Sequence, residues 1–168
     1  MTAPAQAGAI HFKEHAMNRP NADGGSGERG LLLQGPIRLV CANSKCWKCG
    51  SGTPVVALAP AGIRDTDDDD AGHSQEGSLV YNIPEDGMPE SLQLALARHA
   101  PLYVPTYSGT MGEVIWANRC AACNAIQGAF YLHCEPDGAF FDHRDSSNCT
   151  YLDLVDGDVM VSEADYSI

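Results

Sequence analysis

The amino-acid sequence predicts a mostly β fold of the α+β class, and three observations support this class. Apolar residues alternate with a period of two in several short segments, as they do in strands that bury one face. Two Cys-x-x-Cys pairs, at residues 46–49 and 120–123, each lie between two such segments. Residues 90–100 combine helical apolar spacing with flanking prolines, so we expect one helix inserted among β hairpins.

Residues 1–30 are rich in Ala, Gly, Asn and Pro, and they bury too little apolar surface to offset the entropy of ordering. We expect a flexible tail there and a single domain over residues 31–168. The sequence has no run of about 18 apolar residues, and its first ten residues do not resemble a secretory signal. With an odd number of cysteines, seven, these features predict a cytoplasmic protein without a membrane partner.

The first cysteine pair lies between two predicted strands. Residues 31–41 predict the strand that enters the pair, because apolar side chains recur there at period two. These side chains are Leu31, Leu33, Ile37, Leu39 and Cys41. Residues 53–59 predict the strand that leaves it. An acidic loop at residues 62–77 and a short strand at residues 78–83 follow.

The predicted helix begins after Pro89, since proline is favoured in the first turn of a helix. Glu90 lies near the positive end of the helix dipole, and Leu92 and Leu96 belong to one apolar stripe. Pro101 ends the helix, because proline cannot continue the hydrogen-bond ladder.

The second cysteine pair also lies between two predicted strands, at residues 113–118 and 128–133. The remaining predicted strands are at residues 138–141, 151–155 and 159–162. An Asp156-Gly157 turn predicts a hairpin between the last two strands.

Together the two pairs supply four thiolates, the number that one tetrahedral zinc ion needs. The predicted ligands of one structural Zn²⁺ are Cys46, Cys49, Cys120 and Cys123. Each pair is followed at once by Gly50 or Asn124, residue types that tolerate a left-handed backbone. A turn of that kind can aim backbone N–H groups at the sulfurs.

This pattern resembles the zinc-ribbon class, and the segment Cys120-Ala-Ala-Cys123-Asn124-Ala-Ile-Gln127-Gly128 looks like a rubredoxin-type knuckle. The wider pattern also looks like that of small uncharacterised bacterial proteins, so the resemblance implies a fold and a metal but no activity. Between Cys49 and Cys120 lie 70 residues, where zinc ribbons usually have about 15 to 20. We therefore expect an acidic insertion at about residues 60–101.

The formal net charge is −12, and the chain has no Lys or Arg between Arg64 and Arg98. Non-specific affinity for nucleic acids comes mainly from Lys and Arg, so direct nucleic-acid binding is not expected. A basic protein, or one that itself binds nucleic acid, is the partner that the charge favours.

We predict a non-enzymatic protein-binding module, an adaptor or an inhibitor, that uses this acidic surface. The residues expected to contact the partner are Asp65, Asp67, Asp68, Asp69 and Asp70. One alternative is an enzyme, either a Cys-x-x-Cys redox protein or a hydrolase with a pocket near His99, His133 and His143. The other is a nucleic-acid-binding zinc ribbon with a basic spot formed by Arg38, Lys45, Lys48 and Arg119.

Two further motifs are interpreted as coincidences. Residues 65–76 place acids at positions 1, 3, 5 and 12 of a calcium loop, but Asp70 occupies the sixth position, where such a loop needs Gly. His11-x-x-Glu14-His15 matches an inverted zincin motif, but it lies in the predicted tail.

Other cysteines and aromatic residues are expected in the core. We interpret Cys41, Cys134 and Cys149 as small buried residues rather than metal ligands. Six aromatic residues near the cysteine pairs are expected to pack around the metal. They are Trp47, Trp116, Phe130, Tyr131, Phe140 and Phe141.

Overall fold

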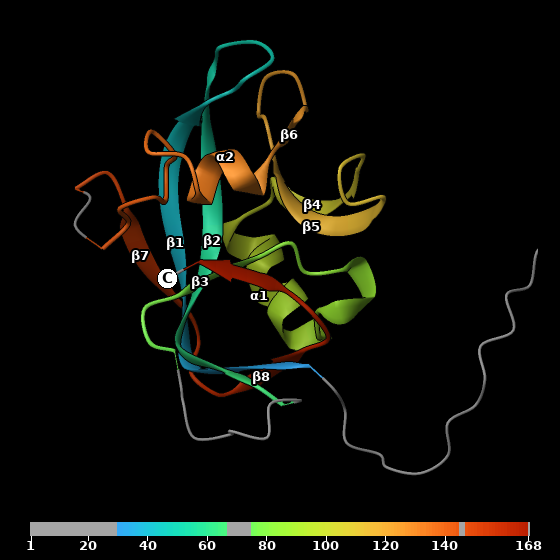
Figure 1. Ribbon diagram of the computed structural model, residues 1–168, viewed down its shortest axis with the longest axis vertical. Helices are drawn as coiled ribbons and strands as arrows, with labels where there is room; N and C mark the ends of the chain where they lie inside the picture. The colour runs from blue at the N-terminus through green and yellow to red at the C-terminus, as the bar shows by residue number, and fades with distance from the viewer. Residues whose placement is uncertain (1–29, 67–74, 145–146, 168) are drawn as a thin grey trace, which may run out of the picture.

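Two antiparallel sheets dominate the computed structural model, which describes residues 30–66, 75–144 and 147–167 (Figure 1). The larger sheet consists of β1 (Leu31–Lys45), β2 (Gly52–Asp65), β3 (Leu79–Tyr81), β7 (Thr150–Val155), β8 (Val159–Val161) and β9 (Asp165–Ser167). The smaller sheet consists of β4 (Tyr103–Ser108), β5 (Glu113–Arg119) and β6 (Ile126–Gln127). The helices are the 3₁₀ turn η1 (Glu85–Gly87), α1 (Glu90–His99) and α2 (Ala129–His133). The predicted mostly β, α+β class is confirmed.

The larger sheet is built around a long hairpin of β1 and β2. The two strands pair from Leu31 opposite Asp65 to Lys45 opposite Gly52, so they extend beyond the predicted segments in both directions. Residues 55–60 of β2 are all buried, because β2 is a central strand covered on both faces. This explains why the sequence of β2 does not alternate between apolar and polar residues.

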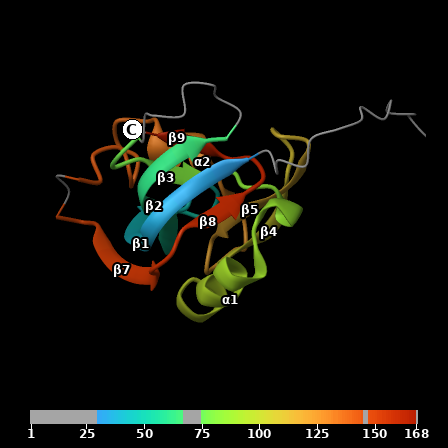
Figure 2. The ribbon, with the colours of Figure 1, turned by 90° about the horizontal axis from the view of Figure 1, so that it is seen from below.

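Two apolar clusters cover opposite faces of this sheet (Figure 2). The first includes side chains of β1 and β2 together with Leu92 and Leu96 of α1 and Trp116 of β5. The second places Leu132 of α2 and Phe140 against other side chains of the hairpin. Segments from the second half of the chain therefore cover both faces of the first hairpin.

Helix α1 agrees with its prediction. It begins after Pro89, and its apolar stripe buries Leu92 and Leu96 completely. Burial of a leucine side chain contributes about 1.5–3 kcal/mol, so these two residues hold the helix on the sheet. None of the helices within the described ranges is both long enough and apolar enough to cross a bilayer.

Two strand predictions after the second cysteine pair are wrong. Residues 129–133 form α2, and the strand that leaves the pair is the two-residue β6. Residues 138–141 form turns. Short apolar runs do not distinguish a strand from a helix by periodicity, and here Leu132 and His133 are buried while their neighbours Phe130 and Tyr131 are exposed.

The hairpin predicted at Asp156-Gly157 is also wrong. Strands β7 and β8 both pair with β1, opposite residues 37–41 and 31–33 respectively. Between these two stretches β1 has an irregularity at Gly35, whose N–H donates to Asp158 Oδ1 at 2.9 Å. The turn after β7 thus passes around this irregularity and brings β8 back onto the same strand.

Candidate metal centre

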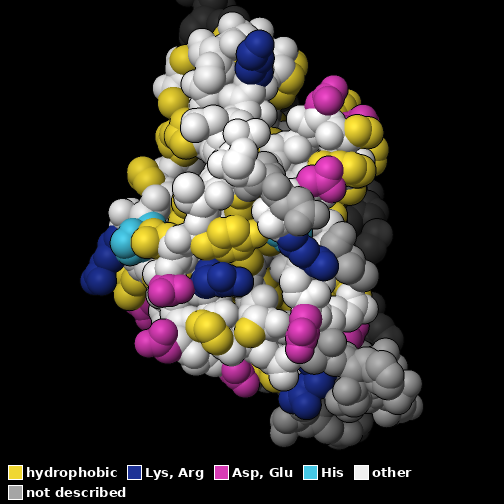
Figure 3. Space-filling view, turned by 90° about the vertical axis from the view of Figure 1, so that its left-hand side faces the viewer, with side chains coloured by type: hydrophobic (Ala, Val, Ile, Leu, Met, Phe, Trp, Pro, Cys, Tyr) yellow, Lys and Arg dark blue, Asp and Glu magenta, His cyan; other side chains and the backbone are white. Residues whose placement is uncertain are grey.

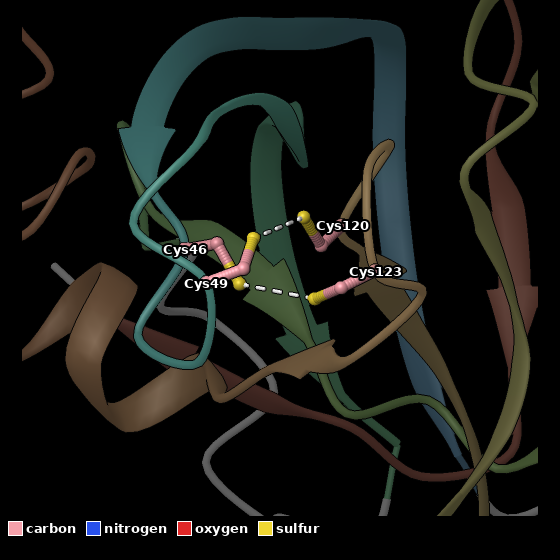
Figure 4. Close-up of side chains that lie close together, drawn as sticks. All are labelled: Cys46, Cys49, Cys120 and Cys123. Carbon is pink, nitrogen blue, oxygen red and sulfur yellow. Dashed lines mark hydrogen bonds between the residues drawn. The ribbon is translucent and has the colours of Figure 1, made fainter.

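The structure brings the four cysteines of the two pairs together (Figure 4). Their Sγ atoms all lie within 4.8 Å of one another. The Cys46 and Cys123 sulfurs are 3.6 Å apart, and the Cys49 and Cys120 sulfurs are 3.7 Å apart. The first pair lies in the turn between β1 and β2, and the second pair lies in the turn between β5 and β6.

These distances fit a four-coordinate metal ion. Zinc bound to thiolates has metal–sulfur distances of about 2.3 Å, so a regular tetrahedron places sulfurs about 3.8 Å apart. A disulfide would need about 2.05 Å. The 3.6 Å and 3.7 Å contacts join one turn to the other, as expected when one ion links two hairpins.

Both cysteine turns, which we call knuckles, have the same backbone hydrogen bonds. Gly50 N–H donates to the Cys46 carbonyl at 2.8 Å, and Asn124 N–H donates to the Cys120 carbonyl at 2.9 Å. The φ angles of Gly50 and Asn124 are 73° and 62°, in the left-handed region predicted from their residue types. The two sequences therefore encode one local geometry twice.

Backbone N–H groups point at the sulfurs, as this geometry predicts. Ala122 N–H donates to Cys120 Sγ at 3.4 Å. In the first knuckle, Cys46 accepts from the N–H groups of Cys49 and Lys48. Such donors stabilise thiolates, the form in which cysteine binds metal.

The thiols cannot all ionise without a cation. Burial opposes ionisation of Cys46, but backbone N–H groups and the Gln127 amide outweigh it and lower its pKa to about 6. At Cys123, donation by the Ala125 N–H lowers the pKa, but burial and the neighbouring thiols oppose it and raise the pKa to about 12. A divalent ion would neutralise this repulsion, so the donor set fits a metal.

Two polar side chains join the second hairpin to the first, beyond the cysteines. Asn118 of β5 accepts from the Val56 N–H at 2.8 Å and donates to the Val56 carbonyl at 2.9 Å. Thr53 Oγ1 of β2 accepts from the Ala121 N–H at 3.0 Å. Both side chains are buried, so their hydrogen bonds fix how the two knuckles face each other.

Two further contacts are closer to the sulfurs. Gln127 Nε2 donates to Cys46 Sγ at 3.4 Å and to the Ala125 carbonyl at 2.8 Å. Trp47 Nε1 donates to the Ile126 carbonyl at 2.7 Å. The sequence analysis assigned no such role to the four side chains that make these hydrogen bonds, which belong to Asn118, Thr53, Gln127 and Trp47. Each of them lies within four residues of a cysteine in the sequence, and this position could have identified them.

The aromatic residues near the centre do not all pack around it as predicted. Trp116 and Phe140 are buried. Trp47, Phe130 and Tyr131 are 69 %, 60 % and 67 % exposed. Trp47 is exposed because it lies in a surface turn, and Phe130 and Tyr131 are exposed because they lie on the outer side of α2.

Within residues 30–66, 75–144 and 147–167, no other cysteine or histidine contributes a ligand to the centre. Cys134 is exposed, contrary to prediction, while Cys41 and Cys149 are half-buried. His133 is buried, stacked on Tyr81 with ring centres 4.0 Å apart. Burial, together with the smaller effect of the nearby His143, lowers the pKa of His133 to about 3.

Asp65, one of the residues predicted to contact a partner, is exposed and lines a groove of about 720 Å³. The groove lies at the end of the β1–β2 hairpin away from the knuckles, since Leu31 and Asp65 pair there. Its five carboxylates belong to Asp65, Asp86, Glu113, Glu163 and Asp165. No Lys or Arg of the described ranges lines it.

The other predicted contact residues, Asp67, Asp68, Asp69 and Asp70, lie outside the described residues, as does most of the calcium-loop motif. The His11-x-x-Glu14-His15 motif also lies outside them.

Comparison with protein-family models, with curated proteins and with solved structures finds no match for the chain. The likeness to zinc ribbons therefore rests on the two knuckles and on the four clustered sulfurs.

Proposed function

We propose that this protein is a non-enzymatic, zinc-stabilised module that binds a basic segment of a partner protein in its acidic groove. Four thiolates fill the coordination sphere of zinc and leave no open position for a water molecule, so the metal has a structural role. The cysteines need a reducing compartment to stay available for zinc, which supports a cytoplasmic location.

The groove is the observation on which the binding proposal depends. It is hollow and combines five carboxylates with the apolar surface of Leu31, Met111 and Tyr166. Lys and Arg side chains have long apolar stems and cationic ends, so a basic peptide would satisfy both kinds of surface. Asp67, Asp68, Asp69 and Asp70 follow Asp65 closely in the sequence, and we expect them to contact the same partner.

The distances between sulfurs favour this proposal over redox catalysis. A Cys-x-x-Cys redox protein joins the two cysteines of one motif, whereas the 3.6 Å and 3.7 Å contacts join cysteines of different knuckles. An adaptor and an inhibitor would use the same groove. An inhibitor would occupy the basic nucleic-acid site of its partner, because its carboxylates would replace phosphate charges.

An arginine-rich peptide probes the groove directly. Calorimetry should detect binding that weakens as salt is raised, since the attraction is between charges. The Glu113→Lys/Glu163→Lys double variant should weaken binding by about tenfold or more. The Asp137→Lys/Asp142→Lys double variant is the matched control, because both residues are exposed and neither lines the groove.

Replacing Asp67 to Asp70 by Ser tests the neighbouring segment separately from the groove. Peptide binding that is unchanged in the Glu113→Lys/Glu163→Lys variant would refute the groove proposal. Protein purified without added metal should contain one zinc ion per chain, and a metal-free protein with the same stability would refute the structural role of zinc.

A further inference from the structure

Three exposed aromatic side chains lie on two segments near the first knuckle. Trp47 lies in this knuckle, and Phe130 and Tyr131 lie on α2, whose Leu132 packs on the β1–β2 hairpin. The Trp47 indole donates to the Ile126 carbonyl at 2.7 Å, only four residues before Phe130. The Phe130 and Tyr131 rings contact edge to face, with centres 5.7 Å apart. We call these three residues and the adjoining cations Lys45, Lys48 and Arg119 the knuckle face.

The Trp47 ring is exposed but held in place. Its N–H group is bound to the backbone of the second hairpin, so the side chain has lost part of its rotational freedom before any ligand arrives. Preorganised aromatic rings bind at a lower entropic cost than mobile ones. Exposure of 69 % leaves most of the indole surface available.

The two segments that carry the knuckle face have a charge opposite in sign to that of the whole chain, and the first carboxylates after the second segment are Glu135 and Asp137, which follow α2. Residues 31–64 and 114–134 contain no Asp or Glu. Lys45 and Lys48 are exposed, and Arg119 is half-buried. In Figure 3 the uppermost lobe, which the β1–β2 turn forms, shows hydrophobic side chains and a Lys or Arg but no carboxylate.

The acidic groove lies at the other end of β1, a strand of 15 residues. The two surfaces come closer along β5, where Glu113 of the groove and Arg119 are the first and last residues. With a rise of about 3.3 Å per residue they are about 20 Å apart, more than twice the Debye length of about 8 Å in physiological salt. The groove therefore contributes little to the potential at the knuckle face. The expectation against nucleic-acid binding was based on total charge, which does not describe this surface.

We propose that the knuckle face binds single-stranded nucleic acid, with bases stacked on Trp47, Phe130 and Tyr131 and phosphates beside Lys45, Lys48 and Arg119. Single strands offer the two features that this surface complements, flat unpaired bases and closely spaced negative charges. An acidic protein segment would match the cations but would leave the three rings without stacking partners. The protein then has two separate binding surfaces, one for nucleic acid and one for a basic protein.

Fluorescence anisotropy of a labelled oligothymidylate of about 12 nucleotides tests the proposal, as this length lies in the range of known single-strand sites. Binding should be present at about 50 mM salt, and the logarithm of the affinity should fall with the logarithm of salt with a slope of about −2, as for three phosphate contacts. The Lys45→Glu/Lys48→Glu variant should lose about tenfold or more in affinity. Arg98→Glu is the control for each single replacement, Lys45→Glu and Lys48→Glu, because it makes the same charge change at an exposed position on α1.

The aromatic rings are tested apart from the charges. Trp47→Ala and Phe130→Ala/Tyr131→Ala should each lose about fivefold or more, the effect of removing a base–aromatic stack. Tyr107→Ala is the control, since Tyr107 is 65 % exposed on β4 and outside the knuckle face. Zinc content should be unchanged in every variant. If Trp47→Ala does not fold, the Phe130→Ala/Tyr131→Ala variant still tests the role of the rings.

Three results would overturn the proposal. The first is no anisotropy change at about 50 mM salt. The second is binding that the aromatic variants leave intact, which would indicate charge attraction alone. The third is equal competition by polyglutamate, which would identify an acidic protein as the ligand. The groove variants Glu113→Lys and Glu163→Lys should still bind oligothymidylate. The proposal for the knuckle face can therefore fail while the proposal for the groove holds, and the reverse.

Discussion

The two hairpins that carry the knuckles have the same turn but very different support. Strand β1 pairs with β2 along nearly its whole length, whereas β5 pairs with β6 at only two positions, Asn118 with Gln127 and Arg119 with Ile126. Both turns nevertheless have left-handed residues in the same place and equivalent hydrogen bonds. The geometry of each knuckle is therefore set by its own residues, whereas its stability depends on the strands and side chains that contact the turn.

The second hairpin is supported by β4, which pairs with β5, and by side-chain contacts with the first hairpin. Hydrogen bonds from Asn118 to Val56, from the Ala121 N–H to Thr53, and from Gln127 to Cys46 tie it to the longer hairpin. A bound ion would add the last link. We therefore expect the first hairpin to keep its structure under conditions in which the second does not.

Removal of the metal should have the largest effect and should separate the two hairpins. The apparent binding free energy of structural zinc, about 10–16 kcal/mol, is coupled to folding. After chelation, or in Cys123→Ser, backbone amides of β5 and β6 should exchange rapidly with solvent, whereas those in the middle of β1 and β2 should stay protected. Hydrogen exchange with mass spectrometry measures both. Cys134→Ala is the control, because this exposed thiol is no ligand; equal loss of protection in both hairpins would contradict the comparison.

Replacement of Asn118 by Leu should have the next largest effect. The change leaves the Val56 N–H and carbonyl buried without partners, and each such group costs about 1–3 kcal/mol. Urea unfolding should therefore show a loss of about 2–6 kcal/mol with zinc bound. Asn43→Leu serves as the control, since Asn43 is exposed on β1. A loss no larger than that of the control would show that the metal alone joins the hairpins.

Acid should destabilise the packing of α2, the helix that follows the second hairpin, because His133 becomes protonated. Burial lowers the pKa of this imidazole to about 3 from the ordinary value of 6.5, so the unfolded chain binds the proton more readily. Its contribution to stability is complete above pH 6.5 and is lost as the pH falls toward 3, at up to about 1.4 kcal/mol per pH unit.

His133→Phe should reduce the slope of unfolding free energy against pH below 6.5, because the stacked ring remains while the titrating group is removed. Zinc also leaves its thiolates in acid, and the difference between wild type and variant at each pH cancels that common loss. An unchanged slope in His133→Phe would contradict this role of the histidine.

The smallest effects should come from substitutions of the left-handed residues in the two knuckles. Gly50→Ala should cost about 1–2 kcal/mol, since an L-residue is strained at φ 73°, and Asn124→Gly should be nearly neutral. Gly52→Ala is the control, because a Cβ there meets no atom within 4 Å and the backbone is not left-handed. Thermal unfolding with zinc bound measures all three variants. A neutral Gly50→Ala would show that the first knuckle does not depend on its glycine.

Several elements were predictable because their signals are local. Strand β1, before the first knuckle, has clear alternation, and Pro89 and Pro101 bound the helix on either side of its apolar stripe. Strand β4 was missed because it contains Pro105, which is typical of edge strands and weakens the strand signal. Strand β9 was missed because its three residues are stabilised by pairing with β3, which no local pattern indicates.

The composition and spacing of the sequence determined the mostly β class, the four clustered cysteines and the left-handed residues that follow them. These features depend on residue type and on neighbours a few positions away, which a sequence displays. Only the tertiary structure decided that Asn118 meets Val56, that Trp47 is exposed and that five carboxylates share one groove. Those results depend on contacts between segments tens of residues apart, and their free energy comes from burial and geometry that arise only when the chain has folded.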